Sequence, residues 1–212
     1  MYLPKHFASS SNQAAESLIR QYPLAQVITI DGQGQLVCNP IPLLVRDQLA
    51  AGSALIGHVA RANPLWQQEG PVLAVFTGPQ AYITPNAYPS KAEHHRVVPT
   101  YNYATVQVRG QLIAHDDIAA KLEAVGELTD FAEQSQPRPW AVSDAPDDFV
   151  LANLRAIVAI EIRIESVTAK FKLSQNRSAA DQAGVRDYLA SQVTDADAAV
   201  MLNLMHPYDN DH

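Results

Sequence analysis

Residues 157–165 read IVAIEIRIE, and this stretch decides the fold class of the 212-residue chain. From Ile160 to Glu165, an isoleucine alternates with a charged residue at every step. Successive side chains of a β-strand point to opposite faces, so the isoleucines share one face and the charges share the other. The pattern predicts a half-buried strand, which is typical of an antiparallel sheet with one solvated face.

Further strand patterns lie on the N-terminal side and are mostly joined by short turns. We expect strands over residues 25–30, 35–38, 43–46, 54–59, 72–77, 80–84 and 104–114. Helical periodicity predicts helices over residues 12–21, 116–133, 149–157, 179–190 and 195–206. Because few helices separate the strands, we expect a mainly β (α+β) fold. An antiparallel barrel with added helices is favoured over a doubly wound parallel sheet.

Glycine and proline predict two interruptions in the middle of the chain. Gly78-Pro79 is expected to form the turn of a strand pair. Residues 85–100 hold three prolines and are expected to form a long loop. A loop of this length in a compact domain is usually functional, so we expect binding residues there.

The composition excludes several classes of protein. The chain has 15 Lys and Arg against 22 Asp and Glu, a net charge of −7 at pH 7. Nucleic-acid binding depends on clustered cations, so a generally basic binder is excluded, although a local basic patch is not. No apolar run reaches the roughly 20 residues of a membrane span. The single cysteine, Cys38, permits no intramolecular disulfide, and we expect a packed thiol in a cytoplasmic protein.

Common catalytic signatures are absent from the sequence. It contains no G-x-G-x-x-G, no G-x-x-x-x-G-K-[ST], no H-E-x-x-H and no G-x-S-x-G. His94 and His95 are adjacent, so their rings diverge on a regular helix or strand, and we expect no metal site. The sequence therefore assigns no residue a catalytic role.

Residues 57–64, GHVARANP, contain the residue types that bind anions. His58 and Arg61 precede Asn63-Pro64, a pair that places a capping side chain before a proline at the first helical position. Arginine and a helix N-terminus both suit a phosphate. On spacing alone, an ordinary helix cap with a solvated arginine is equally consistent.

Two further stretches contain candidate binding residues. YITPNAYPSK at 82–91 and VPTYNY at 98–103 combine aromatic rings with amides, which suits a flat heterocycle, although a proline-stiffened loop explains them slightly better. KFKLSQNR at 170–177 packs three cations, a hydroxyl and two amides into eight residues. A sheet edge protected by charge is the alternative, but the amides and hydroxyl favour a binding site.

Six collinear stretches resemble the PaiB-like family, known as FMN-binding negative transcriptional regulators. They are MYLPKHF at 1–7, GHVARANPLW at 57–66, VFTGPQAYITPNAYPSK at 75–91, EHHRVVPTYNYATVQVRG at 93–110, IVAIEIRIE at 157–165 and KFKLSQNR at 170–177. The resemblance implies an FMN-binding split β-barrel over residues 1–190, followed by a C-terminal helix and a frayed tail over 191–212. It also implies a homodimer with flavin at the subunit interface.

The resemblance implies a role for each group of candidate residues. Arg61 would pair with the FMN phosphate, with His58 and the Asn63 cap beside it, and the 39–43 strand would lie along the isoalloxazine edge. The segment 170–177 would form a rim, and Lys91 with residues 100–102 a lid. The implied cofactor-binding residues are Asn39, Ile41, His58, Val59, Ala60, Arg61, Asn63, Lys91, Thr100, Tyr101, Asn102, Lys172, Ser174 and Gln175.

Three functions are consistent with this resemblance. The first is an FMN-binding transcriptional regulator or flavin-linked sensor, for which DNA contact would need a local patch such as Lys170, Lys172 and Arg177. The alternative is a flavin-dependent oxidoreductase acting on an unknown small molecule. The third is haem binding or degradation, which needs an axial ligand such as His94, His95 or His206.

Overall fold

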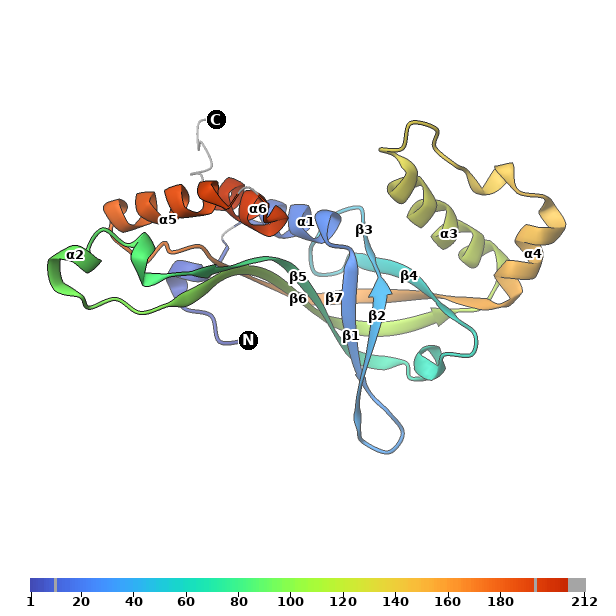
Figure 1. Ribbon diagram of the computed structural model, residues 1–212. Coiled ribbons are helices and arrows are strands. Elements are labelled where there is room, and N and C mark those ends of the chain that lie inside the picture. The colour runs from blue at the N-terminus through green and yellow to red at the C-terminus, as the bar shows by residue number, and fades with distance from the viewer. Residues whose placement is uncertain (10, 193, 206–212) are drawn as a thin grey trace. The chain divides into compact units, whose positions relative to one another are not determined.

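The computed structural model describes residues 1–9, 11–192 and 194–205 and contains one seven-stranded antiparallel sheet (Figure 1). The strand order is β2-β1-β5-β6-β7-β4-β3. The expected antiparallel, mainly β fold with added helices is confirmed. The last residues of the predicted C-terminal tail, 206–212, which include His206, lie outside the described residues.

The strands and helices have the following bounds. The strands are β1 Leu24–Ile30, β2 Leu36–Pro42, β3 Leu44–Arg46, β4 Ala54–Ala60, β5 Gly70–Ile83, β6 Thr100–His115 and β7 Ile157–Lys172. The α-helices are α1 Asn12–Gln21, α2 Lys91–His94, α3 Ile118–Glu133, α4 Asp147–Arg155, α5 Ala179–Ser191 and α6 Ala196–Met205. Short 3-10 helices are η1 Lys5–Phe7, η2 Pro64–Gln67, η3 Pro85–Ala87 and η4 Val142–Asp144.

The alternating stretch that predicted a half-buried strand forms the centre of β7. Ile160, Ile162 and Ile164 are buried, whereas Arg163 is exposed. The strand begins three residues before Ile160 and continues for seven residues after Glu165. Periodicity therefore identified the strand and its buried face but not its length.

The turn predicted at Gly78-Pro79 is wrong, because β5 continues through it without a break. Proline lacks a backbone donor, so a strand accepts it where no ladder bond is needed. β1 pairs with β5 only over Leu73–Val75, well before Pro79. The long loop predicted over residues 85–100 also contains the short helices η3 and α2.

The chain divides into two compact units, and three long strands contribute residues to both. Unit 1 comprises Met1–Ser10, Thr77–Thr105 and Thr168–His212, and unit 2 comprises Ser11–Phe76 and Val106–Val167. The segments of each unit are therefore far apart in the sequence. Each unit has its own buried residues and is described separately.

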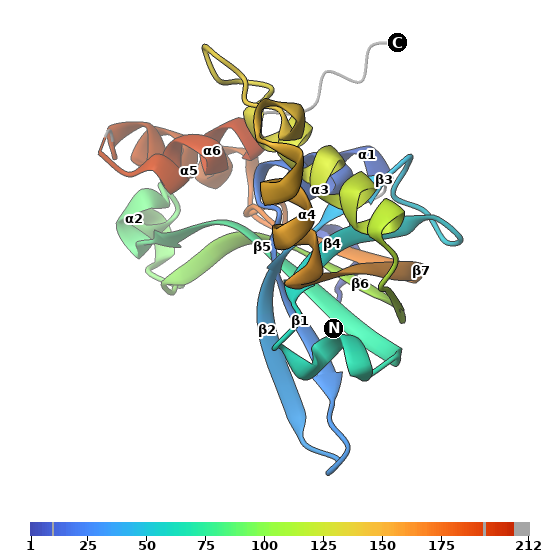
Figure 2. The same cartoon turned by 90° about the vertical axis from the view of Figure 1, so that its right-hand side faces the viewer.

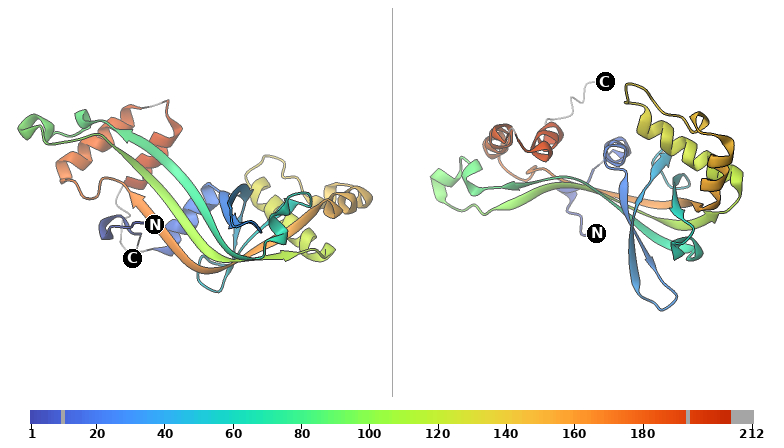
Figure 3. Two further views of the ribbon diagram at one scale, coloured as in Figure 1. Left: turned by 90° about the horizontal axis from the view of Figure 1, so that it is seen from below. Right: turned by 45° about the vertical axis from the view of Figure 1, so that its right-hand side comes forward.

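In unit 1, helices α5 and α6 cover one face of the strand segments (Figure 3). Tyr88, Val185 and Met201 belong to the buried cluster that joins these elements. A Cβ placed on Gly184 would lie 2.2 Å from the Ala87 carbonyl oxygen. Glycine at this position therefore permits α5 to approach the chain after β5 closely.

In unit 2, helices α3 and α4 pack together near β4 (Figure 2). The core of the sheet includes Val27, Leu55, Val108 and Ile162, each fully buried. Within the described part of the chain, no helix combines the length and apolarity that crossing a membrane requires.

Candidate functional site

Unit 2 brings the end of β2 against β4 at Gly57. A Cβ at Gly57 would lie 2.8 Å from the Pro42 carbonyl oxygen and 2.7 Å from Leu43 Cδ2. Ile41 is buried at the same crossing, where its Cγ2 atom would be 3.6 Å from such a Cβ. Only a residue without a side chain allows the two strands to meet this closely.

The residues that follow β4 return to β2. The Asn63 side-chain amide donates a hydrogen bond to Asn39 Oδ1 over 3.0 Å, and Asn63 Oδ1 accepts one from the Leu65 backbone over 3.0 Å. The predicted cap at Asn63 is therefore present. The expected helix is only a four-residue 3-10 turn that begins at Pro64, which has no N–H. The turn thus supplies fewer donors to an anion than a full helix N-terminus.

Arg61 lies directly beside this turn and is held by several partners. Its Nε donates to the Arg155 carbonyl oxygen over 2.7 Å, and Nη2 contacts the Ile157 carbonyl oxygen at 3.4 Å. Its two terminal nitrogens also pair with the carboxylate of Asp116. The side chain remains 39% exposed, so a ligand can reach the guanidinium from solvent.

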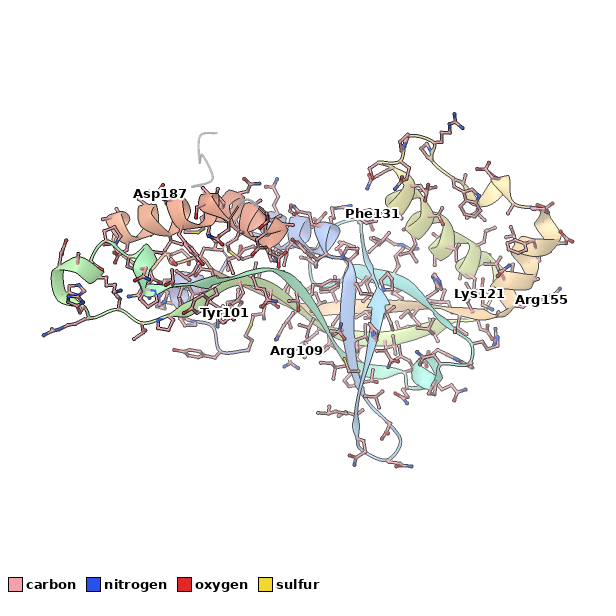
Figure 4. All side chains as sticks on the ribbon, viewed as in Figure 1. Tyr101, Arg109, Lys121, Phe131, Arg155 and Asp187 are labelled. Carbon is pink, nitrogen blue, oxygen red and sulfur yellow. The ribbon has the colours of Figure 1, made fainter. Side chains whose placement is uncertain are left out.

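Asp116 was not identified as a candidate from the sequence. It accepts hydrogen bonds from both Arg61 and the buried Lys121 (Figure 4 labels Lys121 and Arg155). These bonds from Arg61 and then Lys121 hold the pKa of the Asp116 carboxyl far below its usual range. Asp116 is therefore an anion already bound at Arg61, and a phosphate there would share or replace its contacts.

Val59 and Ala60 are the last two residues of β4 and lie in the sequence between the β2–β4 crossing at Gly57 and Arg61. They pair with Val158 and Ile157 of β7 in an antiparallel register. Val59 is buried and Ala60 is exposed. Their position next to Arg61 is as expected from the sequence, but only Ala60 presents its side chain to solvent.

The outer side of β2 offers hydrogen-bond acceptors. β2 is an edge strand, and its Pro40 and Pro42 have no N–H, so they fit positions whose backbone faces away from β1. Residues two apart in a strand have the same orientation. Pro40 therefore presents a carbonyl oxygen and no N–H on the outward side, whereas the Pro42 carbonyl oxygen lies against Gly57 of β4.

The structure does not place His58 with the Arg61 group. His58 instead lines a pocket near α3 and α4, together with Val125 and Phe149. Its Nδ1 atom is buried and makes no hydrogen bond to any residue that the structure describes. Burial lowers the pKa of His58, so its imidazole is neutral at pH 7.

Unit 1 contains the other half of the candidate residues, and two of them are internal. Asn102 and Ser174 are buried and hydrogen-bond to each other over 3.1 Å. The Asn102 amide also lies 3.8 Å from Met205 Sδ of α6. Such a buried pair stabilises the packing under α6 and does not contact a ligand at the surface.

Lys172 joins the predicted rim to the predicted lid within unit 1. Its ammonium donates to Thr100 Oγ1 over 2.7 Å and to the Tyr101 carbonyl oxygen. Lys91 instead donates to Asn86 Oδ1 in the same loop. Gln175 bonds the backbone of its own turn, donating to the Phe171 carbonyl oxygen and accepting from the Leu173 N–H.

Lys172 lies near two further cations, Lys170 and Arg177. Lys170 lies on the same strand face and Arg177 follows in the next turn, and no carboxylate pairs with any of the three among the described residues. Burial, followed by the charges of Arg177 and Lys170, lowers the pKa of Lys172. The Tyr103 ring lies 5.3 Å from the Lys170 ammonium and 5.9 Å from that of Lys172. Cation–π contacts partly offset the repulsion among these charges.

Two other sequence candidates have simple surroundings. His94 accepts a hydrogen bond from the Arg96 backbone, and His95 ends α2 with a positive φ of 56°. In the described parts of the chain, no three His, Cys, Asp or Glu side chains are grouped to hold a metal. The expectation of a packed Cys38 is wrong: its thiol is exposed on the edge strand β2 and donates to Gln26.

Comparison with known families identifies the chain. Residues 1–166 match the family described as "Putative FMN-binding domain". The chain belongs to this FMN-binding family. The matched range contains the β2–β4 crossing, Arg61 and the lid residues, whereas the basic segment over residues 170–177, at and beyond the end of β7, lies outside it.

Curated relatives of this FMN-binding chain come from bacteria and fungi. The protease synthase and sporulation protein PAI 2 of Bacillus subtilis is 28% identical over 91% of this chain and 90% of its own. The resemblance to the PaiB-like family is thereby confirmed. An uncharacterised Aspergillus fumigatus protein is 32% identical over 62% of this chain, which covers 64% of the relative's length.

Solved structures show the same split-barrel fold at low sequence identity. The flavocytochrome Anf3 from Azotobacter vinelandii matches with a TM-score of 0.56 at 14% identity, over 80% of this chain and 72% of that one. The FAD and haem binding protein from Mycobacterium smegmatis matches with a TM-score of 0.54 at 17% identity, over 77% and 72%. These likenesses establish the fold, and the family match supports FMN as the cofactor.

Proposed function

We propose that this FMN-binding protein holds the flavin in unit 2, with its phosphate on Arg61 and its ring along the β2–β4 crossing. The observation that carries the proposal is the half-exposed Arg61 guanidinium beside the Asn63–Asn39 hydrogen bond. Planar guanidinium groups bind phosphate oxygens in pairs, as this one binds the Asp116 carboxylate. When bound, FMN would supply redox chemistry through its ring.

The donors present fit a phosphate monoester. An arginine has five N–H groups, and four of those on Arg61 are used by the Arg155, Asp116 and Ile157 oxygens. One N–H on Nη1 is left for a ligand without any change in these contacts. The Asn63 amide adds a neutral donor in the same turn. His58 is left out, because it lines a different pocket.

Replacing Asp116 with asparagine is expected to strengthen FMN binding about tenfold while changing riboflavin binding less than twofold. The neutral amide no longer competes for Arg61, and it removes a negative charge next to the phosphate. Flavin fluorescence quenching measures both affinities. Because Lys121 also loses an ionic partner, thermal unfolding must show that the variant is folded. Unchanged FMN affinity in a folded variant would place the phosphate elsewhere.

The role that we propose is flavin-linked sensing or regulation of the PaiB kind. The cluster of Lys170, Lys172 and Arg177 would supply the local positive charge that DNA contact needs in an acidic protein. A flavin-dependent oxidoreductase is the second candidate. Rapid reduction of bound FMN by a nicotinamide nucleotide, with transfer to an acceptor, would favour the enzyme over the sensor.

We also propose that the protein is a homodimer in which a second copy covers the β1–β2 hairpin. Ile30 and Leu36 form a facing pair and are 63% and 77% exposed, although both are large apolar residues. Light scattering is expected to give twice the 23.1 kDa mass of one chain, and Leu36→Lys to give a monomer. A monomeric parent protein, or a variant that remains dimeric, would contradict this assignment.

A further inference from the structure

A pocket in unit 2 differs in its chemistry from the Arg61 group. It measures about 280 Å³ and is formed by β4, α3, η4, α4 and the start of β7. Its lining residues are His58, Val125, Trp140, Val142, Ala145, Phe149, Val150, Asn153, Leu154, Ala156 and Ile157. The lining contains no lysine, arginine or carboxylate, so it suits an uncharged ligand.

Polar groups in this pocket are few. The Asn153 amide is used within α4, where it donates to the Phe149 carbonyl oxygen. His58 Nδ1 is buried and has no hydrogen-bond partner among the described residues. Leaving a buried nitrogen without a partner lowers the free energy of unfolding, and burying an apolar residue there would avoid this cost. A ligand hydroxyl that bonded this nitrogen would supply the missing partner.

The mouth of the pocket exposes unusually large apolar side chains. Trp140 is 45% exposed and Phe149 is 59% exposed. Binding of a flat apolar molecule would remove part of this surface from water. Small-molecule sites commonly combine such an apolar lining with one or two well-placed polar groups.

We propose that this pocket binds a small uncharged aromatic molecule with one hydroxyl group, of the phenol class, with the hydroxyl bonded to His58 Nδ1. A neutral imidazole nitrogen can accept from a hydroxyl, or donate to it if the proton is on Nδ1, so either tautomer supports the bond. The ring lies against the apolar lining. This ligand is additional to FMN, whose phosphate finds no cation in the lining.

Calorimetric titration of the FMN-saturated protein with p-cresol and toluene tests the proposal. The two probes are similar in size, but only p-cresol has a hydroxyl. We expect p-cresol to bind at least tenfold more tightly than toluene. In His58→Leu, which replaces the unpaired nitrogen with an apolar side chain, the two affinities are expected to become equal while the melting temperature does not fall.

Two other variants make the test specific. Phe149→Ala is expected to weaken the binding of both p-cresol and toluene, because it removes part of the apolar lining. His115→Leu changes another histidine of unit 2, one that contacts Glu161 and lines a different pocket, and is expected to preserve the preference for p-cresol. Equal affinities in the parent protein, no binding of either probe, or a preference that survives in His58→Leu would overturn the proposal. Loss of p-cresol binding on loading with FMN would assign the pocket to the flavin instead. The Arg61 assignment is tested separately by comparing FMN with riboflavin.

Discussion

Arg61→Ala is expected to weaken FMN binding about 100-fold and to leave riboflavin binding within a factor of three. FMN and riboflavin share the same ring system, and only FMN has a phosphate, so the ratio of their affinities isolates the contacts to phosphate. Hydrogen bonds between charged groups are the strongest class, and each changes affinity by about tenfold or more. The expected loss therefore corresponds to about two such bonds, one from the free N–H on Nη1 and one from a nitrogen that otherwise bonds Asp116.

The control for this experiment is Arg46→Ala. Arg46 belongs to the same unit and is also partly exposed, but it pairs with Glu123 and Glu127 instead of Asp116. This variant is expected to bind both flavins as the parent does. Because Arg61 also bonds the Arg155 and Ile157 carbonyls, its variant must first be shown to unfold cooperatively. Equal weakening of FMN and riboflavin would show that Arg61 supports the fold and not the phosphate.

Gly57→Val is expected to abolish binding of FMN and riboflavin alike and to lower the free energy of unfolding by about 3 kcal/mol. A side chain here would overlap the Pro42 carbonyl oxygen and the Leu43 side chain, both less than 3 Å from an ideal Cβ. The end of β2 must then move away from β4. Since the flavin ring is proposed to lie along this crossing, its affinity should fall with or without a phosphate.

Gly126→Ala is the matched control for Gly57→Val. Gly126 lies inside α3, where a new Cβ would have no neighbour within 4 Å. Alanine is the better helix former, so this variant is expected to be slightly more stable and to bind both flavins normally. Chemical denaturation and flavin titration measure the two effects. If Gly57→Val were as stable as the parent and bound riboflavin normally, the crossing would not support the ring.

The elements with strong local signals could be predicted from the sequence. The alternation around Ile162 identified the central part of β7, and the Asn63-Pro64 pair identified a capped turn. The continuous β5 was missed because Gly78-Pro79 usually marks a turn. Whether a proline is tolerated depends on which neighbouring strand needs a donor, and that pairing is not visible in local sequence.

The contacts of the candidate site depend on pairings between distant residues, which no local pattern records. Arg61 and Asp116 are 55 positions apart, and the acid was recognisable only as part of a helix start. His58 and Arg61 are close in sequence, yet His58 lines the pocket beside α4. Asn102 and Ser174 were predicted to contact a ligand because they carry an amide and a hydroxyl. In the structure these two groups hydrogen-bond to each other inside unit 1.

Titration of the purified parent protein with FMN and with riboflavin tests the central claim most directly. Flavin fluorescence quenching is expected to show saturable binding of one FMN per chain, with an affinity at least tenfold above that for riboflavin. This result would establish the cofactor and the contribution of its phosphate together. Absence of saturable FMN binding, or equal affinities for the two flavins, would contradict the proposal that Arg61 holds the phosphate of a bound FMN.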